Sequence, residues 1–216
     1  IFEQHYGAKR VFEIKGGATV TFNDLIITGA AGHPSYTDNY AHGAGIANLG
    51  GTVTLNRVEV IDNVSLGYLG GGILNGVGSA MTINDSVISD NSVNGGYDAN
   101  GGRAQGAGIY NEGDLTVNGS TISANLFTGA ITESKGTGIY NTGAGSLATI
   151  INSTIAENQG IDGDPSASDG GGVFNEDGGE LVVINSTFAR NIAKRGSAIY
   201  SGLLWDPTIC EIKNTI

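Results

Sequence analysis

Apolar and polar residues alternate in short stretches along nearly the whole chain. One stretch, residues 116–125, reads Thr-Val-Asn-Gly-Ser-Thr-Ile-Ser-Ala-Asn, with apolar side chains at its second and seventh places. Five other stretches repeat this pattern, at residues 21–30, 54–63, 82–91, 149–158 and 182–191. Alternation over so few residues has the period of a β-strand and not of a helix.

A second repeat precedes most of these stretches. It consists of Gly-x-Gly, an apolar residue, any residue and Asn, and it occurs at residues 43–48, 70–75, 106–111, 136–141 and 170–175, with a degenerate copy at 196–201. One unit cannot bury its apolar side alone, whereas stacked copies bury Ile, Val and Leu against one another. The repeats therefore predict an all-β fold, a single-stranded right-handed parallel β-helix (β-solenoid) of about seven coils.

The repeat also indicates how the chain is divided. We expect residues 1–12 to form an N-terminal cap or pairing segment and residues 13–216 to form the β-helix, with an incomplete last coil. Polar, glycine-rich insertions at 92–103 and 159–169 lengthen some coils and are expected to project from one edge of the rod. Such loops either form a working surface or are tolerated decoration.

Asparagines recur at two fixed places of the repeat. Asparagine tolerates left-handed turn geometry, and stacked copies can hydrogen-bond to one another and to the turn backbone. The first set is expected to form a structural ladder: Asn63, Asn91, Asn125, Asn158 and Asn191. The second set marks another turn: Asn48, Asn75, Asn111, Asn141 and Asn175.

The amino-acid composition argues against some classes of binding partner. Ten basic residues against 21 acidic ones give a net charge of −11, which disfavours binding to nucleic acid. No apolar run reaches the roughly 20 residues that span a bilayer. Cys210 is the only cysteine, so no disulfide forms within the chain, and we expect it to be a small buried apolar residue.

The Gly-Gly-Ile-x-Asn repeat, followed by a strand that ends in Asn, resembles the repeats of chlamydial polymorphic outer-membrane proteins. It is also similar to large bacterial surface and secreted proteins with right-handed β-helix repeats, and the likeness covers about residues 10–216. The resemblance implies export and an extracellular or cell-surface location, with an adhesive or structural role. A repeat of this kind indicates the fold rather than an activity.

Residues that could carry chemistry are sparse. Basic residues are scattered, and repeat-equivalent strand positions hold Thr, Ser and Asn rather than paired carboxylates, so we assign no catalytic residue and expect no enzyme. Calcium is the only cofactor considered, with Asp162, Asp164 and Asp169 as candidate ligands in a loop that otherwise reads as an acidic, solvated segment.

Two further groups have ordinary explanations. Residues 33–42 contain two histidines, two tyrosines and Asp38, which suit a covering loop better than a metal site. A row of threonines that includes Thr54, Thr82 and Thr116 is a feature of ice-binding solenoids, but here it is interpreted as strand propensity on an exposed face because the row ends at Val182.

The leading hypothesis is a structural or adhesive β-helix module outside the cell. It would bind copies of itself end to end to make filaments, or a glycan or protein at a surface, because an open end of a β-helix leaves strand edges unpaired. The alternative is a carbohydrate-active enzyme, a polysaccharide lyase or hydrolase, that uses the loop edge as a cleft.

Overall fold

The structure, a computed structural model, describes residues 10–32, 42–95, 102–129, 131–160, 168–202 and 208–216. Within these residues every regular element is a β-strand, and none is a helix long and apolar enough to cross a membrane. The strands pair in parallel across successive coils, which confirms the parallel β-helix.

Two sheets of seven strands run the length of the rod. Sheet 1 consists of β1 (Phe12–Lys15), β5 (Ile46–Leu49), β9 (Ile73–Asn75), β14 (Ile109–Asn111), β19 (Ile139–Thr142), β23 (Val173–Glu176) and β26 (Ile199–Ser201). Sheet 2 consists of β2 (Thr19–Asn23), β6 (Thr52–Asn56), β10 (Ala80–Asn84), β15 (Asp114–Asn118), β20 (Leu147–Ile151), β24 (Glu180–Ile184) and β27 (Ile209–Lys213).

Three smaller sheets complete the coils. Sheet 3 consists of β3 (Ile26–Thr28), β7 (Glu59–Ile61), β11 (Val87–Ser89), β16 (Thr121–Ser123), β21 (Thr154–Ala156) and β25 (Thr187–Ala189). Sheet 4 consists of β4 (Ala31–Gly32), β8 (Val64–Ser65), β12 (Ser92–Asn94) and β17 (Leu126–Thr128). Sheet 5 consists of β13 (Gly102–Gln105), β18 (Ile131–Lys135) and β22 (Ser168–Asp169).

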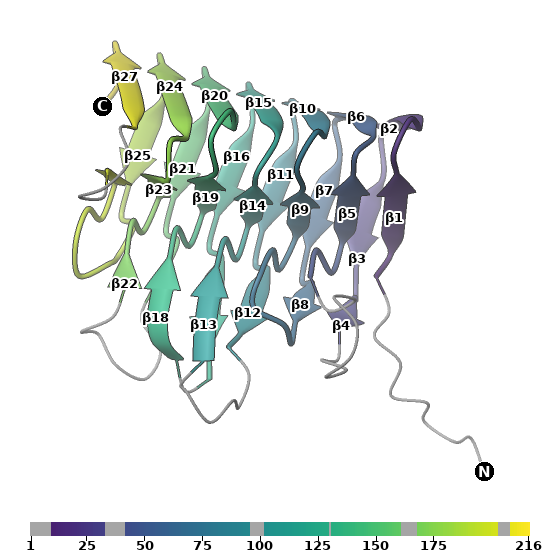
Figure 1. The fold of residues 1–216 in the computed structure, drawn as a ribbon, viewed down its shortest axis with the longest axis horizontal. Helices are drawn as coiled ribbons and strands as arrows, with labels where there is room; N and C mark the ends of the chain where they lie inside the picture. Colours follow the sequence, from purple (N-terminus) through teal and green to yellow (C-terminus); the bar gives the residue numbers. More distant parts are fainter. Residues whose placement is uncertain (1–9, 33–41, 96–101, 130, 161–167, 203–207) are drawn as a thin grey trace.

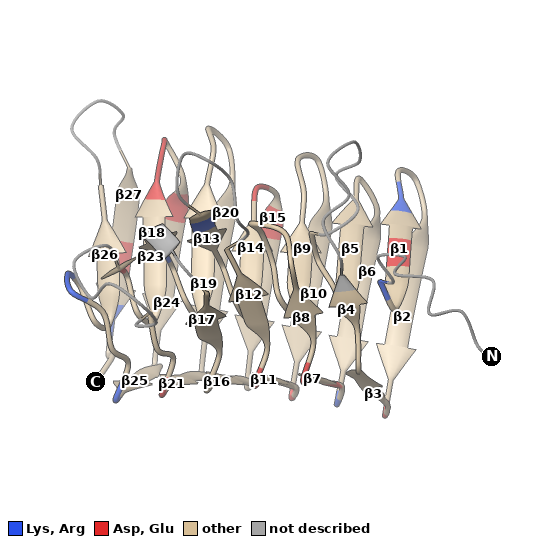
Figure 2. Ribbon diagram, turned by 90° about the horizontal axis from the view of Figure 1, so that it is seen from below, with Lys and Arg blue, Asp and Glu red and all other residues tan. Residues whose placement is uncertain are grey.

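The coil is right-handed. In Figure 1 the chain rises through sheet 1 in front, crosses the upper edge in sheet 2 and descends behind in sheet 3, while it advances from right to left. Figure 2 shows Lys, Arg, Asp and Glu both at turns and within strands, while most of the ribbon is uncharged.

The core consists of columns of apolar residues, one from each coil, that point inward from sheets 1, 2 and 3. In sheet 2, Val53 and Leu55 of one coil pair with Met81 and Ile83 of the next, and all four are buried. Strand alternation places every second residue inside, so each column buries its members against copies of themselves. This arrangement is what the sequence repeat predicts.

Residues 92–94 lie in sheet 4 and residues 102–103 lie in sheet 5, on the lower side of the rod in Figure 1. Not all of the segment 92–103 is loop, which corrects the sequence-based description. Its first residues form β12, which pairs with β8 and β17, and its last residues begin β13, which pairs with β18. Strand pairing with neighbouring coils therefore extends into the insertion.

Candidate functional site

The first set of asparagines forms a continuous buried line of hydrogen bonds. Asn63 Nδ2 donates to Asn91 Oδ1 at 3.0 Å, and the pattern repeats along the rod to Asn191. Each acceptor oxygen also takes the backbone N–H of the preceding asparagine. The left-handed residue is not the asparagine itself but the one before it: Asp62, Asp90, Ala124, Glu157 and Arg190. The asparagine is left free to point inward, where its amide can find partners.

The second set forms a similar line at the turn between sheets 1 and 2. Asn48 Nδ2 donates to Asn75 Oδ1 at 3.0 Å, and Asn75 donates to Asn111 at 2.8 Å. The line continues through Asn141 and Asn175 and ends on Ser201 Oγ at 3.2 Å. All five asparagines are buried.

A column of aromatic rings lies on the outer face of sheet 1. Tyr110, Tyr140, Phe174 and Tyr200 stack in turn, with ring centroids 5.3, 5.8 and 5.0 Å apart. The first three rings are buried although they point away from the main core. They are covered in part by Lys135 of β18, whose Nζ lies 5.3 Å from the centre of the Phe174 ring. Because the rings are stacked on each other and buried, their faces are not open to a sugar ring.

Two of these tyrosines hydrogen-bond to glutamates, and with Lys135 they form the Tyr–Glu cluster (Tyr110, Glu112, Lys135, Tyr140 and Glu176). Tyr110 Oη donates to Glu112 Oε1 at 3.1 Å, and Tyr140 Oη donates to Glu176 Oε1. Lys135 Nζ lies 3.1 Å from both carboxylate oxygens of Glu176. Glu176 is only 1% exposed, so its charge is compensated by direct partners rather than by water.

The electrostatics follow from this burial. Burial, and then the Glu112 carboxylate, raises the pKa of Tyr110, while burial and the hydrogen bond to Glu176 raise the pKa of Tyr140. For Lys135, burial acts to lower the pKa, but the hydrogen bond to Glu133 and the charge of Glu176 outweigh it and raise the pKa overall. Both tyrosines therefore act as hydrogen-bond donors at neutral pH, and the lysine stays charged.

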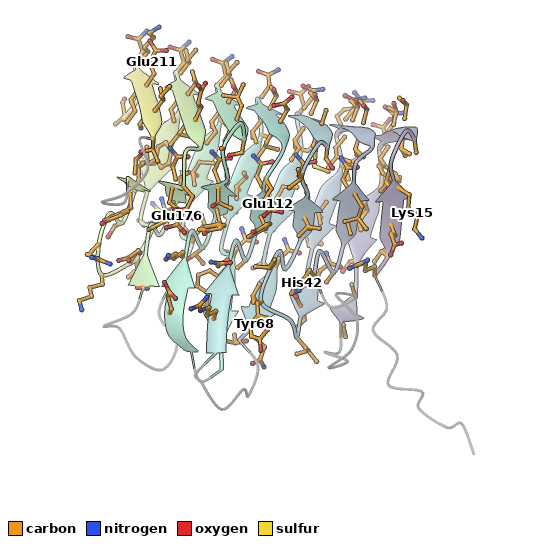
Figure 3. The ribbon with its side chains drawn as sticks, in the orientation of Figure 1. Lys15, His42, Tyr68, Glu112, Glu176 and Glu211 are labelled. Atoms are coloured by element: carbon orange, nitrogen blue, oxygen red, sulfur yellow. The ribbon has the colours of Figure 1, made fainter. Side chains whose placement is uncertain are left out.

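Glu112 and Glu176 occupy equivalent positions two coils apart, which the sequence analysis missed. Thr142 pairs with Glu176, and Asn111, which precedes Glu112, pairs with Asn141, so Thr142 lies between the two glutamates in the register. Figure 3 shows both glutamates on the side of the rod formed by sheet 1. The sequence does indicate that the two positions are equivalent, because each glutamate directly follows the Asn of a Gly-x-Gly repeat.

The candidate calcium ligands are not brought together by the described residues. Asp162 and Asp164 lie outside them. Asp169 is in β22, where its carboxylate accepts hydrogen bonds from Arg195, Nε to Oδ1 at 2.6 Å. Among the described residues no group of three or more His, Cys, Asp and Glu side chains could hold a metal ion.

Most of the histidine- and tyrosine-containing insertion, residues 33–41, also lies outside the described residues. His42 is described, and its Nδ1 accepts the backbone N–H of Leu69 at 3.2 Å. Burial, aided by the nearby charge of Arg10, lowers the pKa of His42 to about 4. His42 is therefore a neutral hydrogen-bond acceptor that joins two coils.

The last described coil, which contains β26 and β27, presents an uncovered face. Ile212 occupies the same inward column as Val183, yet Ile212 is 51% exposed whereas Val183 is fully buried. Cys210 follows Leu181 in the neighbouring column and is also exposed, which corrects the expectation of a buried cysteine. The reason is that no further described strand covers these positions.

No family model, no curated protein and no solved structure matches the chain.

Proposed function

We propose that the chain is an extracellular structural module that forms longer β-helical rods by stacking end to end on copies of itself. The observation that carries the proposal is that every coil pairs in parallel and in register with the next, from β1–β5 to β24–β27, so that one coil is a template for another. Among the described residues β26 and β27 are paired on one side only, and Ile212 is exposed there. Edge strands with free N–H and C=O groups recruit further strands, and exposed apolar side chains add a hydrophobic driving force.

The opposite face of the described rod offers matching positions. Phe12 and Phe22, with ring centroids 4.7 Å apart, belong to the inward columns that end in Ile199 and Ile212 at the other face. Phe12 is exposed and Phe22 is buried at this face, whereas Ile212 is exposed and Ile199 is half-buried at the other, so each face leaves one of the two columns open. Stacking one face on the other would continue each column, as successive coils already do within the chain.

The extracellular assignment rests on the resemblance to bacterial surface β-helix proteins and agrees with the strongly acidic composition. In this proposal the coil insertions beside sheets 4 and 5 would contact a glycan or a protein at a surface. The end faces would set the length of the assembly, and the insertions would set what it adheres to.

Assembly is expected to depend on concentration and on Ile212. Size-exclusion chromatography with light scattering, and electron microscopy, should find rods that lengthen with protein concentration. Cys210 lies on the proposed interface, so its labelling by a maleimide should slow as assembly proceeds. Ile212→Lys should weaken association at least about tenfold, because it places a charge in an apolar contact.

Val77→Lys is the matched control, since Val77 is 76% exposed and lies in the turn before β10, away from both faces. It should leave assembly unchanged. A chain that stays monomeric at all concentrations, with Cys210 equally reactive throughout, would contradict the proposal.

Polysaccharide cleavage is the second candidate, and the positions of Glu112 and Glu176 favour it. Two coil spacings place their backbones about 9.5 Å apart, and inverting glycosidases hold their carboxyl groups about 6.5–9.5 Å apart. It ranks second because Glu176 is buried and held by Lys135 and Tyr140. The test is release of reducing sugar from acidic polysaccharides. Activity that is abolished by Glu112→Gln but kept by Glu59→Gln, a substitution in a sheet 3 strand, would make polysaccharide cleavage the preferred function. Equal rates for both variants would exclude a catalytic role for Glu112 and contradict this second candidate function.

A further inference from the structure

The outer face of sheet 2 carries two regular columns of polar side chains. The first consists of Thr21, Thr54, Thr82, Thr116 and Thr149, each paired in register with the next. The second consists of Asn23, Asn56, Asn84 and Asn118, two residues farther along the same strands. We call these nine residues the threonine–asparagine face. Figure 3 shows the outward side chains of sheet 2 in repeating groups along the upper edge.

This face is a lattice with two fixed spacings. Neighbouring strands lie about 4.8 Å apart, and alternate residues along a strand lie about 6.6 Å apart. The pairing runs without a register shift through all seven strands of sheet 2, whereas sheet 5 contains one between Gly102 and Arg103. The columns are therefore straight, and every copy of a side chain is repeated at the same interval.

The side chains are also held in similar orientations. Threonine is branched at Cβ, so few rotamers are open to it on a strand. Asn56 Nδ2 donates to Asn23 Oδ1 at 2.9 Å, and Asn84 Nδ2 donates to Asn56 Oδ1 at 3.0 Å. No threonine hydroxyl of the face hydrogen-bonds another described residue, so the hydroxyls are available to water.

The chemistry of the face excludes most other ligands. Neither column contains a charged or aromatic residue between β2 and β24, although the chain as a whole has a net charge of −11. A protein partner would need aromatic or arginine anchors, and a sugar would need rings to stack on. The nine residues supply only methyl groups, hydroxyls and amides at regular intervals. The third outward position of the same strands is mixed and holds Thr19, Thr52, Ala80, Asp114, Leu147 and Glu180.

We propose that the threonine–asparagine face binds the surface of ice. Each hydroxyl and amide can both donate and accept a hydrogen bond, as a water molecule in ice does. The spacing between neighbouring strands is close to the shorter oxygen repeat of hexagonal ice, so water ordered along each column can join the crystal. Each contact is weak, but the repeat adds many of them over a rigid surface, and bridging waters cost little when both partners are ordered.

The chain of residues 1–216 is tested for inhibition of ice recrystallisation and for shaping of single ice crystals. The wild type should arrest grain growth and produce faceted crystals. Thr116→Tyr should reduce the activity at least about tenfold, because the ring lifts the lattice off the crystal. Thr82→Lys is a second variant at another point of the same column and should have the same effect.

Thr121→Tyr is the matched control, because Thr121 faces outward from sheet 3 in the same coil as Thr116. It should keep wild-type activity, and circular dichroism should find all variants folded. Grain growth and crystal shape equal to those in buffer with the wild type would overturn the proposal. So would an equal loss of activity in Thr121→Tyr and Thr116→Tyr. Neither result depends on end-to-end assembly, because Thr82, Thr116 and Thr121 lie in coils between the two end faces.

Discussion

Asn125→Ala is expected to lower the free energy of unfolding by about 4–6 kcal/mol. Asn125 is fully buried in the middle of the first asparagine line. Its Nδ2 donates to Asn158 Oδ1 at 2.9 Å and to the Ile88 carbonyl at 3.1 Å, and its Oδ1 accepts both the side-chain and backbone N–H groups of Asn91 at 3.1 Å. Alanine removes all four bonds, whose partners lie in the two neighbouring coils. The Asn91 backbone N–H and the Ile88 carbonyl lose this partner, whereas Asn158 Oδ1 keeps the backbone N–H of residue 125 and Asn91 Nδ2 keeps the Val60 carbonyl.

The size of the effect follows from those abandoned partners. A buried polar group that loses its hydrogen bond costs about 1–3 kcal/mol, and water can reach few of these groups in a column that is closed along the rod. The expected loss is a large share of the roughly 5–15 kcal/mol by which domains are stable. Urea unfolding followed by circular dichroism measures it directly.

Asn118→Ala in the same coil is the control, since that side chain faces outward from sheet 2. It should change the stability by no more than about 0.5 kcal/mol. Equal midpoints for the two variants would mean that the buried line contributes no more than an exposed asparagine does.

The fold was predictable because one physical requirement recurs in every coil. Val60, Ile88 and Ile122 fill the same inward column of sheet 3, so the same apolar place appears in each copy of the repeat. The positions of the buried asparagines follow from the same periodicity. A sequence repeat of this kind predicts the features that every coil has in common, namely its inward apolar residues and its buried asparagines.

The Tyr–Glu cluster was not predictable because it depends on residues that do not repeat. Tyr140 lies at an outward position of sheet 1, where alternation alone predicts exposure, and it is buried because Lys135 and Gln105 come over it from sheet 5. Sheet 5 is built partly from an insertion of variable length. The contacts of sheet 5 do not recur from coil to coil, so the sequence repeat does not predict them. Cys210 was misjudged for a related reason, because its column is inward but nothing described covers it.

Gly108→Ala is expected to lower the free energy of unfolding by about 3 kcal/mol or more. Gly108 is the third residue of the Gly-x-Gly repeat, at a place where neighbouring coils approach closely. A Cβ at this position would lie 2.5 Å from the Gly138 carbonyl oxygen and 2.9 Å from Asn125 Nδ2. The carbonyl cannot move aside cheaply, because it accepts the N–H of Ile109 at 2.9 Å. The amide is fixed in the asparagine line.

The close approach of Gly108 to the Gly138 carbonyl and to Asn125 explains why the repeat has glycine at this position. It also couples the Gly-x-Gly half of the repeat to the half that ends in Asn. A methyl group at Gly108 would push apart two coils and displace Asn125 at once, so the glycine and asparagine variants should fail to add when combined. Gly16→Ala is the control, because its nearest neighbours would lie at 3.8 Å, and it should change stability by about 0.5 kcal/mol or less. Thermal or urea unfolding of the two single variants and the double variant tests the argument. A Gly108→Ala chain as stable as Gly16→Ala would mean that the coils can separate locally, and that the close approach of their backbones is not what the repeat preserves.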